Sequence, residues 1–347
     1  MQERTIELLR CPFSMSAMTE LNAEKNQMVN GVSHIIDGTV HFGDQIYRIE
    51  DAILKFGSHG NKKLYDKMWE GDFTKQRQGD AQYGVSRREK LLNRLGNKTF
   101  GWLEGKKFLD VGCGLGRFTH AAVEMGADAI ALDSSDVALK SIFTRLSESL
   151  TTDEFGRCDF VQADIMQPIF KDSSFDVVFS SYVLHHTEHT RKAIEIVSRY
   201  VNVNGTLAIS IHNVQSGRLS MLRLLREEVM SLPEETLFRA MAKGGLLKME
   251  GVEILIDLPE IVKTCKNDPE LSAVADKIEL DYLIHRENLI TPYAWQQLNS
   301  EIRGWFNKLG FTVEFQKGET TVGYRGRREK GRFKTWLVRK LLDGIQG

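Results

Sequence analysis

The chain has 347 residues, enough to bury a large core as one big domain or two ordinary ones. Its 46 Lys and Arg residues nearly balance 47 Asp and Glu residues, which argues against a protein built around a general polyanion-binding surface. Cys11, Cys113, Cys158 and Cys265 have no paired spacing, so they indicate neither a disulfide framework nor a zinc site. The charged start and the lack of an apolar run of roughly 20 residues predict a soluble cytoplasmic protein.

Residues 1–60 predict a small β-rich N-terminal segment. Its second half is rich in β-branched and aromatic residues, and Asp37-Gly38 and Gly43-Asp44 interrupt these short runs. Such a pattern is typical of β-hairpins, with a turn expected at each of the two pairs.

Residues 61–104 predict a helical approach segment. Tyr65, Trp69 and Phe73 recur there at helical spacing among charged residues. Such an aromatic stripe is typical of core packing, and the alternative is that Tyr65 and Trp69 contact the substrate.

Residues 105–214 predict an α/β core. Apolar strands alternate there with helical patterns, and the strands are expected at residues 108–111, 129–133, 159–164, 175–181 and 205–213. This alternation predicts a parallel sheet with helices on both faces. Ligands of such sheets bind at the carboxyl ends of the strands, so the polar residues there are the candidate site.

The first of these strands ends in a glycine-rich turn, since residues 108–120 read FLDVGCGLGRFTH. Gly112, Gly114 and Gly116 occupy alternate positions before a predicted helix. Glycine permits a positive φ and close approach of a ligand to the backbone, and a helix start favours an anionic group. A dinucleotide fingerprint would need a glycine where Arg117 stands, so the turn does not match a pyrophosphate cradle.

Polar residues also end the next three strands. Asp133 can accept hydrogen bonds from both hydroxyls of a ribose. Asp164 beside Ile165 suits an adenine, whose amino group would donate to the carboxylate, and the fourth strand ends at Ser180. Singly, each acid is typical of a solvated residue or a helix cap, but together in this order they predict a ligand that contains a nucleoside.

Four segments resemble the motifs of the class I S-adenosylmethionine-dependent methyltransferases: LDVGCGLGRF (109–118), ALDSS (131–135), FVQADI (160–165) and SFDVVFSSYVLHHT (174–187), with GTLAIS (205–210) as the fifth strand. The resemblance implies a Rossmann-like fold, a seven-stranded sheet whose last strand is antiparallel, and S-adenosyl-L-methionine as the cofactor. It implies that the three glycines wrap the methionine part, Asp133 binds the ribose, and Asp164 with Ile165 binds the adenine. Arg117 helps to hold the carboxylate or is a solvated residue of the first helical turn. The remaining residues of the implied cofactor site are Asp110, Ser134 and Ser180.

A weaker similarity relates residues 9–56 to the small zinc-ribbon module of some bacterial methyltransferases, in which paired cysteines bind metal. Only Cys11 stands in this segment here. We therefore expect no metal there and a degenerate module that persists as a β-hairpin unit.

Tyr182, His185 and His186 follow the fourth strand, and His212 ends the fifth. Methyl transfer gains most from positioning and desolvation, and a hydroxyl acceptor also benefits from a general base such as histidine. One histidine is the predicted base or orienter, with His185 slightly favoured and Tyr182 beside it. The alternative is that both histidines cap the next helix or meet cofactor backbone groups. His185 and His189 have the i, i+4 spacing of metal ligands, but without a third ligand the sequence predicts no metal site.

The acceptor is predicted to be a small molecule. The loop after Ser180 lacks the Asn-Pro-Pro-Tyr typical of relatives that methylate planar amide or base nitrogens, so attack through oxygen or an amine nitrogen is expected. Residues 215–290 predict a helical insertion, either a substrate lid or plain core. Residues 291–330 predict the final helix, opened by Thr291-Pro292, and the last strands of the core. Further candidate substrate contacts are His212, Tyr282, His285, Arg286 and Tyr293.

Residues 331–347 form a basic amphipathic tail, which indicates either a helix packed on its own domain or a peripheral contact with anionic lipid or RNA. The leading hypothesis is a methyltransferase of small-molecule biosynthesis. The alternatives are an RNA methyltransferase, which the balanced charge disfavours, a lipid or quinone methyltransferase, and a non-catalytic cofactor-binding regulatory subunit. The sequence does not predict the oligomeric state.

Overall fold

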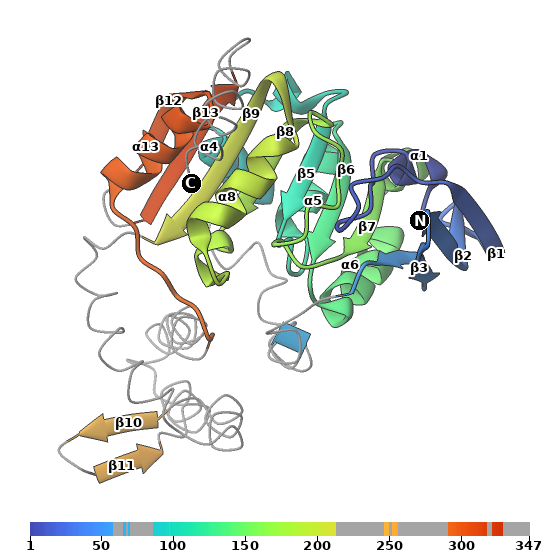
Figure 1. Ribbon diagram of the computed structural model, residues 1–347, viewed down its shortest axis with the longest axis horizontal. Helices are drawn as coiled ribbons and strands as arrows, with labels where there is room; N and C mark the ends of the chain where they lie inside the picture. Colours follow the sequence, from blue (N-terminus) through green and yellow to red (C-terminus); the bar gives the residue numbers. More distant parts are fainter. Residues whose placement is uncertain are drawn as a thin grey trace, which may run out of the picture. The chain divides into compact units, whose positions relative to one another are not determined.

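The computed structural model describes residues 1–57, 65, 66, 69, 86–96, 98–212, 291–314 and 324–328, and the backbone of 246–249, 252–255, 315–317 and 321–323. The chain divides into two units, one of Met1–Asn213 with Gln297–Gly347 and one of Val214–Gln296. The predicted core lies in the first unit (Figure 1).

The described part of the first unit forms an eleven-stranded sheet in the order β1-β2-β3-β4-β7-β6-β5-β8-β9-β13-β12. The strands are β1 (Glu20–Val29), β2 (Val32–Phe42), β3 (Gln45–Glu50), β4 (Ile53–Lys55), β5 (Lys107–Val111), β6 (Asp128–Asp133), β7 (Cys158–Gln162), β8 (Phe175–Ser181), β9 (Val201–His212), β12 (Phe311–Lys317) and β13 (Thr321–Arg328). Strands β5 to β9 are mutually parallel, whereas β13 is antiparallel to both β9 and β12. The parallel core and the antiparallel last strand are confirmed.

The prediction of a seven-stranded sheet was wrong in the number of strands, because the N-terminal hairpins join the same sheet. Leu54 of β4 pairs in parallel with Val161 of β7, and Lys55 pairs with Gln162. Without β4, the outer edge of β7 would present unpaired backbone groups, which proteins commonly cover. The N-terminal segment therefore protects one edge of the core sheet.

Of the two predicted turns in this segment, one is confirmed and the other was wrong. Gly43-Asp44 connects β2 and β3, but Gly38 lies inside β2 and pairs with Ala23 and Ile49. A side chain at Gly38 would collide with the carbonyl oxygen of Asn22. Glycine is needed here for close backbone approach beside a bulge in the pairing of β1 with β2.

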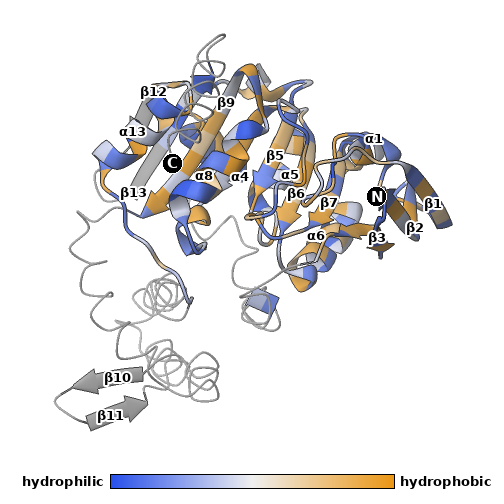
Figure 2. Cartoon of the chain, in the orientation of Figure 1, coloured by the Kyte–Doolittle hydropathy of each residue, from blue (hydrophilic) through white to orange (hydrophobic). Residues whose placement is uncertain are grey.

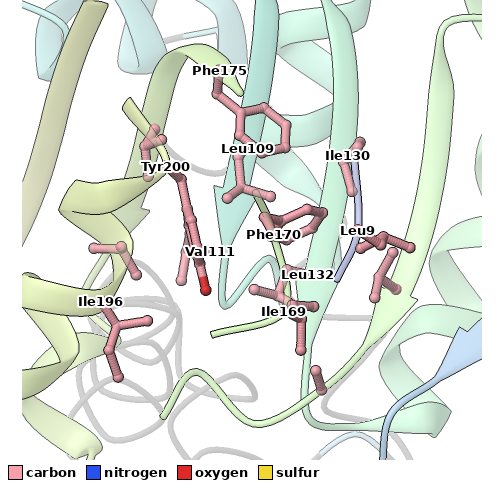
Figure 3. Packing of buried hydrophobic residues seen from close by; sticks show 14 of the residues in the cluster. Leu9, Leu109, Val111, Ile130, Leu132, Ile169, Phe170, Phe175, Ile196 and Tyr200 are labelled. Carbon is pink, nitrogen blue, oxygen red and sulfur yellow. The ribbon is translucent and has the colours of Figure 1, made fainter. Parts of the chain in front are cut away.

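Helices cover both faces of the sheet, as predicted. They are α4 (Arg87–Arg94), α5 (Arg117–Glu124), α6 (Asp136–Ser149), α8 (Thr190–Arg199) and α13 (Asn299–Lys308), with the shorter α1 (Glu3–Ile6), α7 (Thr152–Phe155), η2 (Phe100–Leu103) and η3 (Leu184–His186). The side chains of β5 alternate between the two faces, since Phe108 packs with α4, α5 and α6 while Leu109 and Val111 pack on the side of α8 and α13. The parallel strands are accordingly mostly apolar (Figure 2). Figure 3 shows the core on the α8 side of the sheet, where Leu109 and Val111 lie near Tyr200 and Phe170.

Two strands of the second unit correct the prediction of a helical insertion. β10 (Leu246–Met249) and β11 (Val252–Leu255) pair antiparallel within the range 215–290. A short apolar run rich in Leu and Met has no period that separates strand from helix, so the helical prediction was wrong for these residues. The rest of the predicted insertion and the tail 331–347 lie outside the described residues.

The final helix begins later than predicted. The sequence placed its start at Thr291-Pro292, but α13 runs Asn299–Lys308 and the Leu298 N–H donates to the Glu301 carboxylate at 2.8 Å. The Thr291 hydroxyl instead donates to the Tyr293 carbonyl at 3.1 Å. The predicted end at Gly310 is confirmed, with φ of 84° just after the helix. Within the described residues, no helix is both long and apolar enough to cross a membrane.

Candidate active site

The glycine turn after β5 is held in a conformation that only glycine adopts easily. Gly112, Gly114 and Gly116 have φ of 71°, 52° and 67°. A side chain at Gly112 would overlap Val183, and one at Gly116 would overlap Ile142. The turn therefore combines left-handed backbone with close packing, which explains the alternate glycines in the sequence.

Asp133 at the end of β6 ties this turn to the neighbouring strand. Its carboxylate accepts from the Gly114 N–H at 2.8 Å and from the Ser135 N–H at 2.9 Å. Burial raises the pKa of Asp133 above its ordinary value, and these backbone hydrogen bonds act in the opposite direction. The acid predicted to bind a ribose thus lies directly beside the bare backbone of the glycine turn.

Three other predicted cofactor residues bond to neighbouring strands or turns. Asp110 is buried and accepts from the Thr119 hydroxyl at 2.7 Å, and burial raises the pKa of Asp110 to about 7. The buried Ser180 hydroxyl donates to the Val111 carbonyl at 3.0 Å, and the Ser134 carbonyl accepts a hydrogen bond from a glutamine of β7. These bonds position the turn, and direct contact of the three residues with a cofactor stays a prediction.

Asp164 and Ile165 follow β7, and Arg117 is the first residue of α5. Asp164 accepts from the Met166 N–H at 2.9 Å, and Ile165 packs partly buried against the core. The Ala163 N–H donates to the Asp133 carbonyl at 3.0 Å, so the chain after β7 adjoins the end of β6. Arg117 is half-buried. This burial does not distinguish a contact with the cofactor carboxylate from a solvated residue of the first helical turn.

The approach segment also reaches the glycine turn. Two ring carbons of Trp69 lie 3.2 and 3.3 Å from the position that a side-chain carbon on Gly114 would take. The Ser135 hydroxyl donates to the Asp66 carboxylate at 2.6 Å, and Tyr65 is half-buried. The sequence indicated Tyr65 and Trp69 as candidates but not Asp66, because nothing distinguishes one acidic residue from its neighbours in a charged stretch.

Tyr182 leaves β8 in a left-handed conformation, with φ of 60°. This region is sparsely populated by aromatic residues, and such strain often occurs at functional sites. The Tyr182 N–H donates to the Ser210 carbonyl at 2.8 Å, and the guanidinium of Arg94 lies 4.8 Å from the centre of the Tyr182 ring. Arg94 also donates to the Ser210 hydroxyl at 2.9 Å. Nothing in the sequence distinguished Arg94 from other charged residues of its helix.

Three histidines gather beside Tyr182. The ring of His185 lies 4.1 Å from that of His186 and 4.3 Å from that of His212, measured between centroids. His185 is fully buried, and burial together with the charges of His186 and His212 lowers its pKa well below the ordinary value. One ring nitrogen from each histidine can be chosen so that all three lie within 4.8 Å of one another. These residues could therefore hold a metal ion.

The structure corrects the sequence argument about metal ligands. His185 belongs to η3, whereas His189 is the N-cap of α8 and 64% exposed, so the pair does not share one helical face. His212 supplies a third candidate ligand atom, because the pairing of β8 with β9 brings it to the loop. Sequence reasoning had placed His212 among the substrate contacts.

Of the remaining predicted substrate residues, Tyr293 is the one that the described ranges include. Tyr293 belongs to the second unit, where its ring stacks on Trp295 with centroids 6.3 Å apart. Tyr282, His285 and Arg286 lie outside the described residues.

Residues 109–209 match a family model described as a methyltransferase domain. The chain is 29% identical over 133 residues to a mitochondrial ubiquinone biosynthesis O-methyltransferase of Schizosaccharomyces pombe, covering 38% of this chain and 47% of that protein. It is 31% identical over 109 residues to phosphoethanolamine N-methyltransferase 1 of Triticum aestivum, covering 30% of this chain and 21% of that protein. The chain thus spans less than half the length of these two relatives.

Among solved structures, magnesium protoporphyrin IX methyltransferase from Synechocystis PCC 6803 aligns with 77% of this chain and 100% of its own, at 15% identity and a TM-score of 0.45. The family match coincides with the strands, the glycine turn and the acidic strand ends described above. Residues 109–209 are thus similar to the methyltransferase domains of the class I S-adenosylmethionine-dependent family.

Proposed function

We propose that this chain transfers a methyl group from S-adenosyl-L-methionine to an oxygen or amine nitrogen of a small molecule. The main support is the glycine turn. Left-handed glycines follow β5, and the Gly114 N–H donates a hydrogen bond to Asp133 at the end of β6. Bare backbone beside a strand-end carboxylate suits a ligand that joins an amino-acid part to a ribose.

The cofactor roles follow from the acceptor capacity of these groups. An ionised carboxylate offers about four lone-pair sites, and the N–H groups of Gly114 and Ser135 each use one on Asp133. Capacity remains for a ribose hydroxyl. Asp164 and Ile165, half-buried beyond β7, would receive the adenine, and Arg117 at the start of α5 would face the carboxylate of the methionine part.

The acceptor would approach from the loop after β8. Val183 packs against Gly112, so Tyr182 and the histidines are connected directly to the turn that would hold the methyl donor. In-line attack needs little beyond alignment and exclusion of water. A hydroxyl acceptor must also lose its proton, and the cluster of His185, His186 and His212 is the group placed to assist.

A small acceptor is favoured over RNA. Relatives include an O-methyltransferase of ubiquinone biosynthesis and phosphoethanolamine N-methyltransferases, although one relative is a ribosomal RNA large subunit methyltransferase of Wolbachia pipientis. The net charge of −1 and the absence of Asn-Pro-Pro-Tyr after Ser180 agree with the small acceptor.

The test offers methyl-labelled S-adenosylmethionine with a metabolite extract, RNA, lipid vesicles or protein as separate acceptors. We expect label in the small-molecule fraction, and loss of that transfer in Asp133→Ala. Gly105→Ala is the matched control, because Gly105 lies in another turn with no neighbour within 4 Å of an added side-chain carbon. Label in RNA or lipid alone would select those alternatives, and cofactor binding without transfer to any fraction would favour the regulatory subunit.

A further inference from the structure

We propose that His185, His186 and His212 form a binding site for a divalent transition metal such as Zn²⁺. His185 and His186 belong to η3, and His212 ends the neighbouring strand β9. One ring nitrogen of each lies within 4.8 Å of those of the other two. Imidazole is a preferred ligand of zinc, copper and nickel.

The spacing is close to that of a loaded site. Zn–N distances of about 2.0–2.1 Å in tetrahedral geometry place ligand nitrogens about 3.4 Å apart. The separations in the structure exceed this by at most about 1.4 Å, a change that small rotations of the rings can supply. The ring planes of His185 and His186 meet at 48°, and those of His185 and His212 at 68°, so the rings do not stack face to face.

His185 supplies an independent indication of a ligand. Its side chain is fully buried, and neither ring nitrogen has a hydrogen-bond partner among the described residues. Buried polar atoms in native proteins are nearly always paired, and a bound ion is one established reason for an exception.

A metal held by the three histidines would also act on the methyl acceptor, a step that rests on the proposed function. Three protein ligands with a fourth position for water or substrate is the composition of catalytic zinc sites. A hydroxyl oxygen bound there would lose its proton to water more readily. That oxygen would form the new bond to the methyl carbon while the carbon–sulfur bond breaks and its electron pair stays on sulfur. The site therefore favours an oxygen acceptor over an amine nitrogen.

The test measures metal binding without a methyl donor, so its outcome is separate from that of the proposed function. Protein freed of metal with a chelator is titrated with Zn²⁺ alone and with Co²⁺ alone. We expect one ion per chain in wild type, and affinity at least about 100-fold weaker in His212→Gln and His186→Gln, because even the loss of an outer-shell partner can cost 10- to 100-fold. His189→Gln is the matched control, since His189 lies three residues beyond His186 but is exposed.

Urea denaturation of the metal-free proteins serves as the check that each variant has folded, and it does not depend on cofactor binding. X-ray absorption on zinc-loaded wild type should show three imidazole nitrogens at about 2.0–2.1 Å, a result that needs no variant. Any of three results would overturn the proposal. They are no Zn²⁺ binding by wild type at micromolar concentration, fewer than three imidazole ligands in the X-ray absorption data, or equal Zn²⁺ affinity in the folded variants and wild type.

Discussion

Gly112 of the glycine turn has two reasons to be glycine, a left-handed backbone and a close approach to Val183. Replacing it with alanine, together with the controls below, should separate them. Gly112 has φ of 71°, and an added side-chain carbon would lie 2.6 Å from Cγ2 and 2.9 Å from Cβ of Val183. The left-handed conformation costs about 1–2 kcal/mol for a residue with a side chain, and overpacking adds about 1–3 kcal/mol. The free energy of unfolding should therefore fall by about 2–5 kcal/mol.

A matched control isolates the backbone contribution. Gly105 has a similar φ of 65° but no atom within 4 Å of an added side-chain carbon, so Gly105→Ala should cost only about 1–2 kcal/mol. Val183→Ala removes the two colliding methyl groups. The double variant Gly112→Ala/Val183→Ala should therefore be more stable than the sum of the single effects predicts, with a coupling energy of about 1–3 kcal/mol.

Urea denaturation gives the unfolding free energies, and calorimetry gives the affinity for S-adenosylhomocysteine. Gly112→Ala should also weaken that affinity, whereas Gly105→Ala should leave it unchanged. If Gly112→Ala costs no more than Gly105→Ala and Val183→Ala gives no rescue, the argument from close approach is refuted.

Three further changes test other contacts of the site. Asp133→Ala should weaken S-adenosylhomocysteine binding by about 1.5–3 kcal/mol, the usual worth of hydrogen bonds to a charged group, and unchanged affinity in calorimetry would place the ribose elsewhere. Burial raises the pKa of Asp110 from 3.8 to about 7, so its stabilising contribution is full below about 4 and is lost as pH rises through about 7. Asp110→Asn, which can still accept from Thr119, should gain about 2–3 kcal/mol relative to wild type between pH 5 and 8, from about two pH units at 1.36 kcal/mol each. A pH-independent difference in urea denaturation would contradict this. Arg94→Met removes the guanidinium from the Tyr182 ring and the bond to Ser210, so unfolding free energy should fall by about 1–3 kcal/mol while S-adenosylhomocysteine affinity stays within a few fold. Stability equal to wild type would show that Arg94 does not support the loop.

The parallel core could be predicted because its signals are local. Buried parallel strands are rich in consecutive apolar residues; the glycine turn follows β5 directly, and Asp133 is the last residue of β6. The attachment of the N-terminal segment could not be predicted in this way. It depends on the pairing of Leu54 with Val161, residues far apart in sequence that carry no local mark of contact.

The start of the final helix was mispredicted because apolar spacing can mimic a helix. Trp295 and Leu298 continue the spacing of α13 backwards, yet they are 47% and 44% exposed and precede the helix. The histidine cluster shows the same limit at the site. His185 and His186 were evident as a pair, but His212 joins them only through the register that pairs Ser181 with Ser210.

The central claim is that the ends of β5 and β6 hold S-adenosylmethionine, and calorimetric titration with S-adenosylhomocysteine and with NAD tests it most directly. We expect saturable binding of S-adenosylhomocysteine with one site per chain and no binding of NAD, because the alternate glycines do not match a pyrophosphate cradle. Binding of NAD without binding of S-adenosylhomocysteine would contradict it.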